Sequence, residues 1–239
     1  MANQVQIPFE NRRAAGRVLA HMLTGYADHP GVIVLGLPRG GVPVAAEVAE
    51  ALHAPLDILL VRKLGAPGHE ELAMGAIASD GARILNHEVV RDLRITPRQI
   101  AAVEAREEAE MARRAVSYRD DRPFPDLRGR IVLLVDDGLA TGSTMRAAAE
   151  AVRQKRPAWV VAAAPVAAPQ VRDMLTRIVD EVVIAVLPDP FYAVGLWYRE
   201  FEPTSDEEVR AALRQAWTRT DLAAPPPPRE TDSAPGETR

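Results

Sequence analysis

Residues 131–146 read IVLLVDDGLATGSTMR, and they decide the fold of this 239-residue chain. The five apolar residues Ile131–Val135 are typical of a strand that is covered on both faces, as in a parallel sheet. Asp136 and Asp137 follow where this strand would leave the sheet, at the edge where open α/β sheets bind ligands. An alanine-rich helical pattern begins near Ser143, so the stretch predicts a buried strand, a ligand-binding loop and a helix.

The loop between this strand and this helix has the residue types of a phosphate site. Gly138 and Gly142 allow the backbone to turn tightly and to approach a ligand, while Thr141, Ser143 and Thr144 supply hydroxyl groups. The loop ends at the amino terminus of a helix, where unpaired N–H groups and the helix dipole favour an anion. Such a loop could hold a phosphate on one side and hydroxyls, or a hydrated metal ion, on the other. A sugar phosphate has both.

The pattern of apolar residues, two acids and G-x-A-T-G-x-T resembles the phosphoribosyl-diphosphate motif of the type I phosphoribosyltransferases. The resemblance implies that Asp136 and Asp137 contact the two ribose hydroxyls and hold Mg²⁺ indirectly, through water. It also implies that the residues from Ala140 to Thr144 surround the 5′-phosphate. The alternative interpretation is a Rossmann-like strand whose acid pair only caps the next helix.

The composition limits the class of protein. Hydrophobic residues make up 47% of the chain, so it can bury a substantial core, and one domain is expected. A formal net charge of −4 gives no basic footprint for nucleic acid. The absence of cysteine excludes disulfides and is compatible with a reducing cytosol. The first residues lack an apolar signal core, and no apolar run is long enough to cross a membrane. We therefore expect a cytoplasmic protein without a nucleic-acid or membrane partner.

A second strand, loop and helix precede this stretch. Residues 32–35 are apolar, residues 36–41 read GLPRGG, and a helical pattern follows over residues 42–52. Arg39 could bind a diphosphate, because a guanidinium group matches two phosphate oxygens. In the type I transferases the loop after the first strand binds pyrophosphate, so the resemblance assigns this role to Arg39, Gly40 and Gly41. A glycine turn that serves only close helix packing would look similar.

Residues 57–62, DILLVR, predict a third strand of the same sheet, which ends beside Lys63. The resemblance places a pyrophosphate-contacting base near this position. Lys63 is the candidate and Arg62 the substitute, while an ordinary solvated pair of cations is the alternative.

The region after Lys63 has the pattern of a hairpin. The Asp80-Gly81 dipeptide between short apolar runs favours a tight turn. Residues of about 64–96 therefore predict a flexible flap, similar to the one that type I transferases fold over bound substrate. Glu70 and Glu71, and more weakly His69, are candidates for groups that close over the substrate.

The remaining elements complete an α/β pattern. Apolar runs predict two more strands at residues 159–164 and 182–186. Helical patterns cover residues 9–23, 96–118, 144–154 and 170–178, and another helix begins after Ser205, with capping-box signatures at Thr96 and Ser205. We therefore predict a Rossmann-like parallel sheet of about five strands with helices on both faces. Residues 1–219 form one domain, whose small hood comprises about 1–25 and 187–219. Residues 220–239 form a disordered, proline-rich tail.

Two features bear on the acceptor. Clustered aromatic residues after the last strand either pack a subdomain or form a lid, and by position Phe191 would cover a planar base, as in hypoxanthine-guanine transferases. Those enzymes carry an aspartate in the phosphate loop, where this chain has Ala140, as adenine transferases do. Adenine-type enzymes instead use a flap glutamate, which directs attention to Glu70 and Glu71.

The resemblance implies a magnesium-dependent transfer of phosphoribosyl from phosphoribosyl diphosphate to a nucleobase-type acceptor, or the reverse reaction, as in nucleotide salvage. The partners would be these small molecules, with a homodimer as a further expectation. A non-catalytic regulator that binds phosphoribosyl diphosphate is the main alternative, and an unrelated nucleotide-binding α/β protein is a third.

Overall fold

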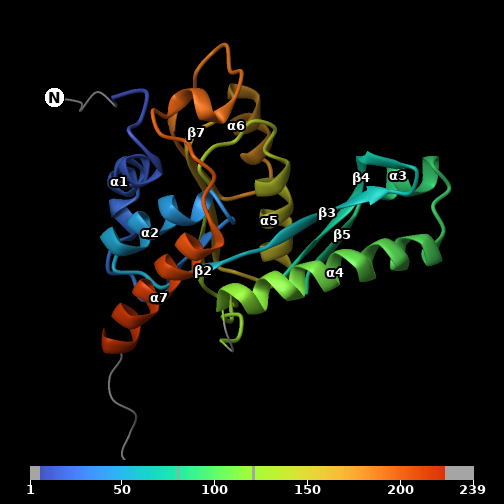
Figure 1. The fold of residues 1–239 in the computed structure, drawn as a ribbon, viewed down its shortest axis with the longest axis horizontal. Helices are drawn as coiled ribbons and strands as arrows, with labels where there is room; N and C mark the ends of the chain where they lie inside the picture. The colour runs from blue at the N-terminus through green and yellow to red at the C-terminus, as the bar shows by residue number, and fades with distance from the viewer. Residues whose placement is uncertain (1–5, 80, 120–121, 224–239) are drawn as a thin grey trace, which may run out of the picture.

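The body of the protein is a five-stranded parallel sheet, as predicted, with the order β2-β1-β6-β7-β8 (Figure 1). The computed structural model describes residues 6–79, 81–119 and 122–223. The strands of this sheet are β1 (Val32–Gly36), β2 (Leu56–Ile58), β6 (Ile131–Val135), β7 (Trp159–Val166) and β8 (Glu181–Val186).

Helices cover both faces of the sheet because successive strand residues point to opposite sides. In β1, Val32 and Val34 belong to one core and Ile33 and Leu35 to the other. The first core contains residues of α1 (Arg12–Met22), α2 (Gly41–Ala51), α4 (Pro97–Arg119) and α7 (Asp206–Ala223). The second contains residues of α5 (Ser143–Gln154) and α6 (Pro169–Leu175). This arrangement explains the uninterrupted apolar runs in the sequence.

The third predicted strand is interrupted, which corrects the sequence-based boundary at residues 57–62. The strand β2 ends at Ile58, and the Leu59 N–H makes a last bond to the Gly36 carbonyl. The Leu60 N–H then binds the Ser79 hydroxyl at 3.1 Å, and the Leu60 carbonyl accepts from the Ser79 N–H at 2.9 Å. The chain therefore passes from one sheet to another within a single apolar run, which the residue types alone do not reveal.

The second sheet is antiparallel and has the order β3-β4-β5. It occupies much of the predicted flap, and its strands β4 and β5 pair in antiparallel on either side of the predicted turn, of which Asp80 lies outside the described residues. Figure 1 shows this sheet and α4 extending together to one side of the body. Its elements are β3 (Val61–Ala66), β4 (His69–Ala78) and β5 (Arg83–Leu85), followed by α3 (His87–Asp92).

Both predicted capping boxes are present. The Gln99 side chain accepts from the Thr96 N–H at 2.9 Å at the start of α4. Glu208 accepts from the Ser205 N–H at 2.7 Å at the start of α7. The helix α7 continues to Ala223, past the predicted start of the tail at residue 220, and residues 224–239 lie outside the described part of the chain.

The two segments predicted as the hood meet at the carboxyl edge of the parallel sheet. The Phe9 N–H binds the Trp197 carbonyl at 2.8 Å, and the Arg199 N–H binds the Phe9 carbonyl at 2.9 Å. Phe9 and Tyr198 form a small apolar cluster with Ala15 and Val166, beside the short 3₁₀ helix η2 (Val194–Trp197). A second 3₁₀ helix, η1 (Thr24–Tyr26), follows α1.

Candidate functional site

The two predicted ligand loops lie side by side, because the strands that precede them are neighbours. The strand β1 pairs with β6 in parallel register, with Gly36 opposite Val135. From this point β1 leads to α2 on one face of the sheet and β6 leads to α5 on the other. A crevice at such a switch in direction is where doubly wound sheets bind ligands.

The loop at residues 38–41, PRGG, packs directly on the acid pair. A methyl group at Gly40 would lie 2.0 Å from Asp137 Oδ2, and one at Gly41 would lie 2.6 Å from the Val135 carbonyl oxygen. Both distances are far below van der Waals contact, so a side chain at Gly41 would collide with the backbone, and one at Gly40 would displace the Asp137 carboxylate. The two glycines therefore allow the loops to pack against each other, in addition to the ligand-binding role that the sequence predicts for them.

Asp137 is held by the hood. The Arg12 Nε donates a hydrogen bond to Asp137 Oδ2 at 2.7 Å, and both side chains are mostly buried. The Tyr198 hydroxyl donates to the Asp137 backbone carbonyl at 2.5 Å. The Arg12 guanidinium also lies 3.9 Å from the centre of the Phe201 ring, a cation–π contact. Sequence reasoning missed Arg12, because a contact between residues 125 positions apart leaves no local pattern.

The two carboxyl groups are electrostatically strained. Burial, followed by the charge of Asp137, raises the pKa of Asp136 well above its usual value. Burial also raises the pKa of Asp137, although the hydrogen bond from Arg12 opposes this shift. A pair of acids with perturbed pKa values in a crevice is typical of a functional site, because folding stability alone would favour removing the repulsion.

The phosphate-type loop leads into α5 as predicted. Gly142 precedes the helix with φ of +69°, a left-handed conformation that favours glycine. The Thr141 and Ser143 hydroxyls lie 3.0 Å apart at the exposed surface of the loop. Ala140 and Thr144 are also exposed, whereas Gly138 lies against Val194 of the hood. The exposed N-terminal turn of α5 is therefore accessible to an anion.

Lys63 and Arg62 lie in β3, and not at the end of a strand of the parallel sheet as predicted. Arg62 donates two hydrogen bonds to Glu107 of α4, at 2.9 Å and 2.5 Å. Successive side chains of a strand point to opposite faces, so Lys63 is directed away from the side on which Arg62 meets α4. Arg62, which the sequence offered as the second candidate after Lys63, is therefore the cation of β3 that lies beside the PRGG loop.

The flap glutamates are distant from the two loops. Glu70 and Glu71 are among the first residues of β4, next to the pairing of His69 with Ala66 at the outer end of the antiparallel sheet. The inner end of this sheet is the pairing of Val61 with Ala78. Five residue steps of a strand separate the two ends of β3, or roughly 16 Å.

The aromatic candidate Phe191 is partly buried. It packs against both the second core and the hood cluster. It follows β8 and precedes η2 in the chain, and the next residue, Tyr192, is exposed.

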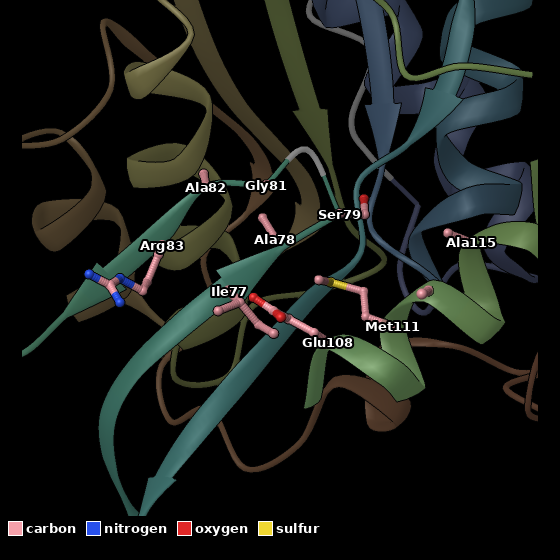
Figure 2. A pocket seen from close by; sticks show the side chains of 10 residues that line it. Ile77, Ala78, Ser79, Gly81, Ala82, Arg83, Glu108, Met111 and Ala115 are labelled. Carbon is pink, nitrogen blue, oxygen red and sulfur yellow. The ribbon is translucent and has the colours of Figure 1, made fainter. Parts of the chain in front are cut away.

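Two cavities adjoin α4. The larger, about 210 Å³, lies at the base of the antiparallel sheet, and Figure 2 shows Glu108 and Met111 of α4 facing Ile77 of β4 across it. The smaller, about 90 Å³, is lined by residues of both ligand loops, including Arg39 and Thr144. The smaller cavity is the one that belongs to the candidate site, since the larger touches neither loop.

Comparison with known proteins agrees with this geometry. Residues 8–189 match the family model described as the phosphoribosyl transferase domain. The chain belongs to this family. Two curated relatives from strains of Mycobacterium tuberculosis, each named "Putative phosphoribosyl transferase", are 45% identical over 230 residues, or 94% of this chain. The alignment covers 52% of each relative, so the chain spans about half the length of the curated relatives it matches.

A solved structure supports the fold of this phosphoribosyl transferase domain. The crystal structure of TT1426 from Thermus thermophilus is 42% identical and superposes with a TM-score of 0.77. The match covers 87% of this chain and 98% of that one. The resemblance expected from residues 131–146 is therefore confirmed at the level of family and fold.

The donor set of the domain suits a hard cation that keeps most of its own water. Among the described residues, no cluster of three or more His, Cys, Asp or Glu side chains could hold a metal ion. Mg²⁺ is commonly bound through one or two carboxylates together with substrate phosphates, which Asp136 and Asp137 fit. No described helix is both long and apolar enough to cross a membrane.

Proposed function

We propose that this domain transfers a phosphoribosyl group from 5-phosphoribosyl 1-diphosphate to a nucleobase-type acceptor and releases pyrophosphate. One observation carries the proposal: the acid pair, the phosphate-type loop and the PRGG loop lie together at the β1–β6 switch, where the PRGG loop packs against the acid pair. Family membership supports the same activity. A ligand with a 5′-phosphate, a diol and a diphosphate matches these three parts of the site.

In this proposal each part binds one group of the donor. The amino terminus of α5, with Thr141, Ser143 and Thr144, holds the 5′-phosphate through N–H groups and hydroxyls. Asp136 and Asp137 orient the ribose hydroxyls and favour positive charge on the sugar. Further donor-binding residues are Gly40, Gly41, Gly138, Ala140 and Gly142, whose small size lets the backbone approach the ligand.

The reaction is a displacement at the anomeric carbon. A ring nitrogen of the acceptor forms the new bond to this carbon, and the bond to the diphosphate oxygen breaks. The nitrogen passes its proton to solvent or to the released diphosphate. Arg39, together with a cation of β3, stabilises the negative charge that develops on the departing diphosphate. Asp136 and Asp137 would hold Mg²⁺ indirectly, through water, and the bound ion would supply positive charge that offsets the charge of the diphosphate.

The acceptor is proposed only as a class. Phe191 would stack on a planar ring, and the flap that carries Glu70 and Glu71 would have to move toward the loops to take part in acceptor binding. Because Ala140 replaces the aspartate of hypoxanthine-guanine enzymes, a 6-oxopurine is not the favoured acceptor.

Pyrophosphate release tests the proposal directly. The protein is mixed with phosphoribosyl diphosphate, Mg²⁺ and, in turn, adenine, hypoxanthine, guanine, uracil and orotate. Release that depends on one base supports the transferase. Tight binding of phosphoribosyl diphosphate without release for any base would favour the regulatory alternative, and absence of binding would reject both.

A further inference from the structure

The charged side chains that line the small cavity beside the PRGG loop are all basic. Three arginines, Arg39, Arg62 and Arg114, contribute to its lining together with Tyr118 and Thr144. None of its lining residues among the described part of the chain is acidic. The arginines come from three separate elements: the PRGG loop, β3 and α4. A cavity that gathers guanidinium groups from three elements is suited to an anion with several charges.

Arg62 and Arg114 each form an ion pair with an acidic residue that lies outside the cavity. Arg62 donates to Glu107 at 2.5 Å and 2.9 Å, and Arg114 donates to Glu110 at 2.8 Å. Burial raises the pKa of Glu107, but the hydrogen bonds from Arg62 and Arg106 outweigh it and leave the pKa below its usual value. The acids are therefore ionised at neutral pH and hold the guanidinium groups beside the cavity.

The third arginine is held much more loosely. Arg39 Nη1 lies 3.8 Å from Asp206 Oδ1, and both side chains are about half exposed. Asp206 also accepts a hydrogen bond from the Tyr118 hydroxyl at 2.5 Å. A surface pair at this separation contributes little free energy, so Arg39 can turn toward an anion at small cost.

We propose that Arg114 of α4, with Arg62 of β3, binds the diphosphate of phosphoribosyl diphosphate together with Arg39. The helix α4 is then a third phosphate-contacting element, beside the two loops that follow β1 and β6. The inference rests on the proposed function, because it takes the diphosphate as the occupant of this cavity. It also assigns the cation of β3 to Arg62, on the face that meets α4, in place of Lys63.

The chain offers a matched control on the same helix. Arg113 is the neighbour of Arg114 and donates to the same carboxylate, Glu110, at 3.0 Å. It does not line the cavity, and its side chain is 69% exposed against 43% for Arg114. Changing either arginine to glutamine removes the same charge from the same helix, so a general electrostatic or folding effect would appear in both variants.

The test is isothermal titration of the full chain in Mg²⁺ with inorganic diphosphate, phosphoribosyl diphosphate and ribose 5-phosphate. Arg114→Gln should weaken binding of the first two ligands by about 10-fold to 100-fold, the effect of losing one charged hydrogen bond. Ribose 5-phosphate, which lacks the diphosphate, should bind as in the wild type. Arg113→Gln should leave all three affinities within about 2-fold of the wild type, and Arg114→Lys should recover part of the loss.

Equal affinities of Arg114→Gln and Arg113→Gln for inorganic diphosphate would overturn the inference, as would a wild type that binds no diphosphate. Thermal melting of the variants separates lost binding from lost fold. A failure of the proposed function is distinguishable, because it would appear as a wild type that binds neither ribose 5-phosphate nor phosphoribosyl diphosphate, whatever the result with inorganic diphosphate.

Discussion

Replacing Gly40 by alanine should separate ligand binding from folding. Gly40 has φ of −61° and ψ of −34°, which alanine adopts without strain. Its new methyl group, however, would lie 2.0 Å from Asp137 Oδ2 and 3.2 Å from Arg12 Nε. The backbone therefore tolerates the substitution, whereas the functional carboxylate does not.

The magnitude follows from the displacement that the clash requires. Real Cβ contacts essentially never fall below 3.0 Å, so the Asp137 carboxylate must move by at least the difference from 2.0 Å, about 1 Å. This shift would break the geometry of the 2.7 Å bond from Arg12. A misplacement of about 1 Å can lower an enzymatic rate by about 100-fold, equivalent to about 2.7 kcal/mol of transition-state stabilisation.

The assay is pyrophosphate release under kcat/KM conditions, together with titration of phosphoribosyl diphosphate and thermal melting. Gly25→Ala is the matched control, because its new methyl group would have no heavy atom within 4 Å. We expect Gly40→Ala to remain folded, with a lower melting temperature because the Arg12–Asp137 bond is disturbed, and with activity about 100-fold lower. Gly25→Ala should keep full activity. Wild-type affinity and activity in a folded Gly40→Ala variant would refute the reasoning.

Three further substitutions test the fold. Arg119→Met leaves the buried Asp57, 2.7 Å from Arg119 Nε, without its partner and should destabilise the protein by about 3–5 kcal/mol at neutral pH. Burial raises the pKa of Asp57, so the folded state binds this proton more tightly than the unfolded state, and the contribution of Asp57 to stability falls as pH rises. Thermal melts should therefore show a smaller loss of stability in Arg119→Met at lower pH. A loss of stability that does not depend on pH would contradict this. Gly142→Ala should lower the free energy of unfolding by at least about 1–2 kcal/mol because the backbone at this residue is left-handed. The loss should be larger because the new methyl group would lie 2.5 Å from Val171, and an unfolding midpoint in urea equal to that of the wild type would rule this out. Ser205→Ala removes the capping box of α7 and should cost about 1 kcal/mol in the same denaturation assay, and no measurable change would argue against the cap.

The sequence alone predicted the parallel sheet and the positions of its two candidate ligand loops. The apolar run at residues 131–135 and the one at residues 32–35 each became a buried strand followed by a loop and a helix. These patterns are local, since strand burial, glycine turns and helix starts are set by neighbouring residues. The prediction that the acid pair and the PRGG loop share one edge also agrees with the observed pairing of β1 with β6.

The missed features depend on contacts between distant segments. Arg12 reaches Asp137 only because the hood folds over the sheet edge. Arg114 lines the same cavity as the PRGG loop only because α4 packs against β3 and α7. The proposal that Arg62, and not Lys63, contacts the diphosphate likewise depends on which face of β3 meets α4. The break after Ile58 went unnoticed, since Leu59 and Leu60 are as apolar as the strand before them.

The most direct test of the central claim is titration of phosphoribosyl diphosphate, in Mg²⁺, into the wild type and the Asp136→Asn/Asp137→Asn variant. The two substitutions preserve shape and relieve the repulsion between the acids, but Asp137→Asn takes the carboxylate from the mostly buried Arg12. The variant should therefore fold with a lower melting temperature than the wild type. We predict saturable binding to the wild type and a loss of at least about 100-fold in the variant, as expected when two groups that each contribute several kcal/mol are removed. Equal affinity in both proteins, or no binding to the wild type, would contradict the account.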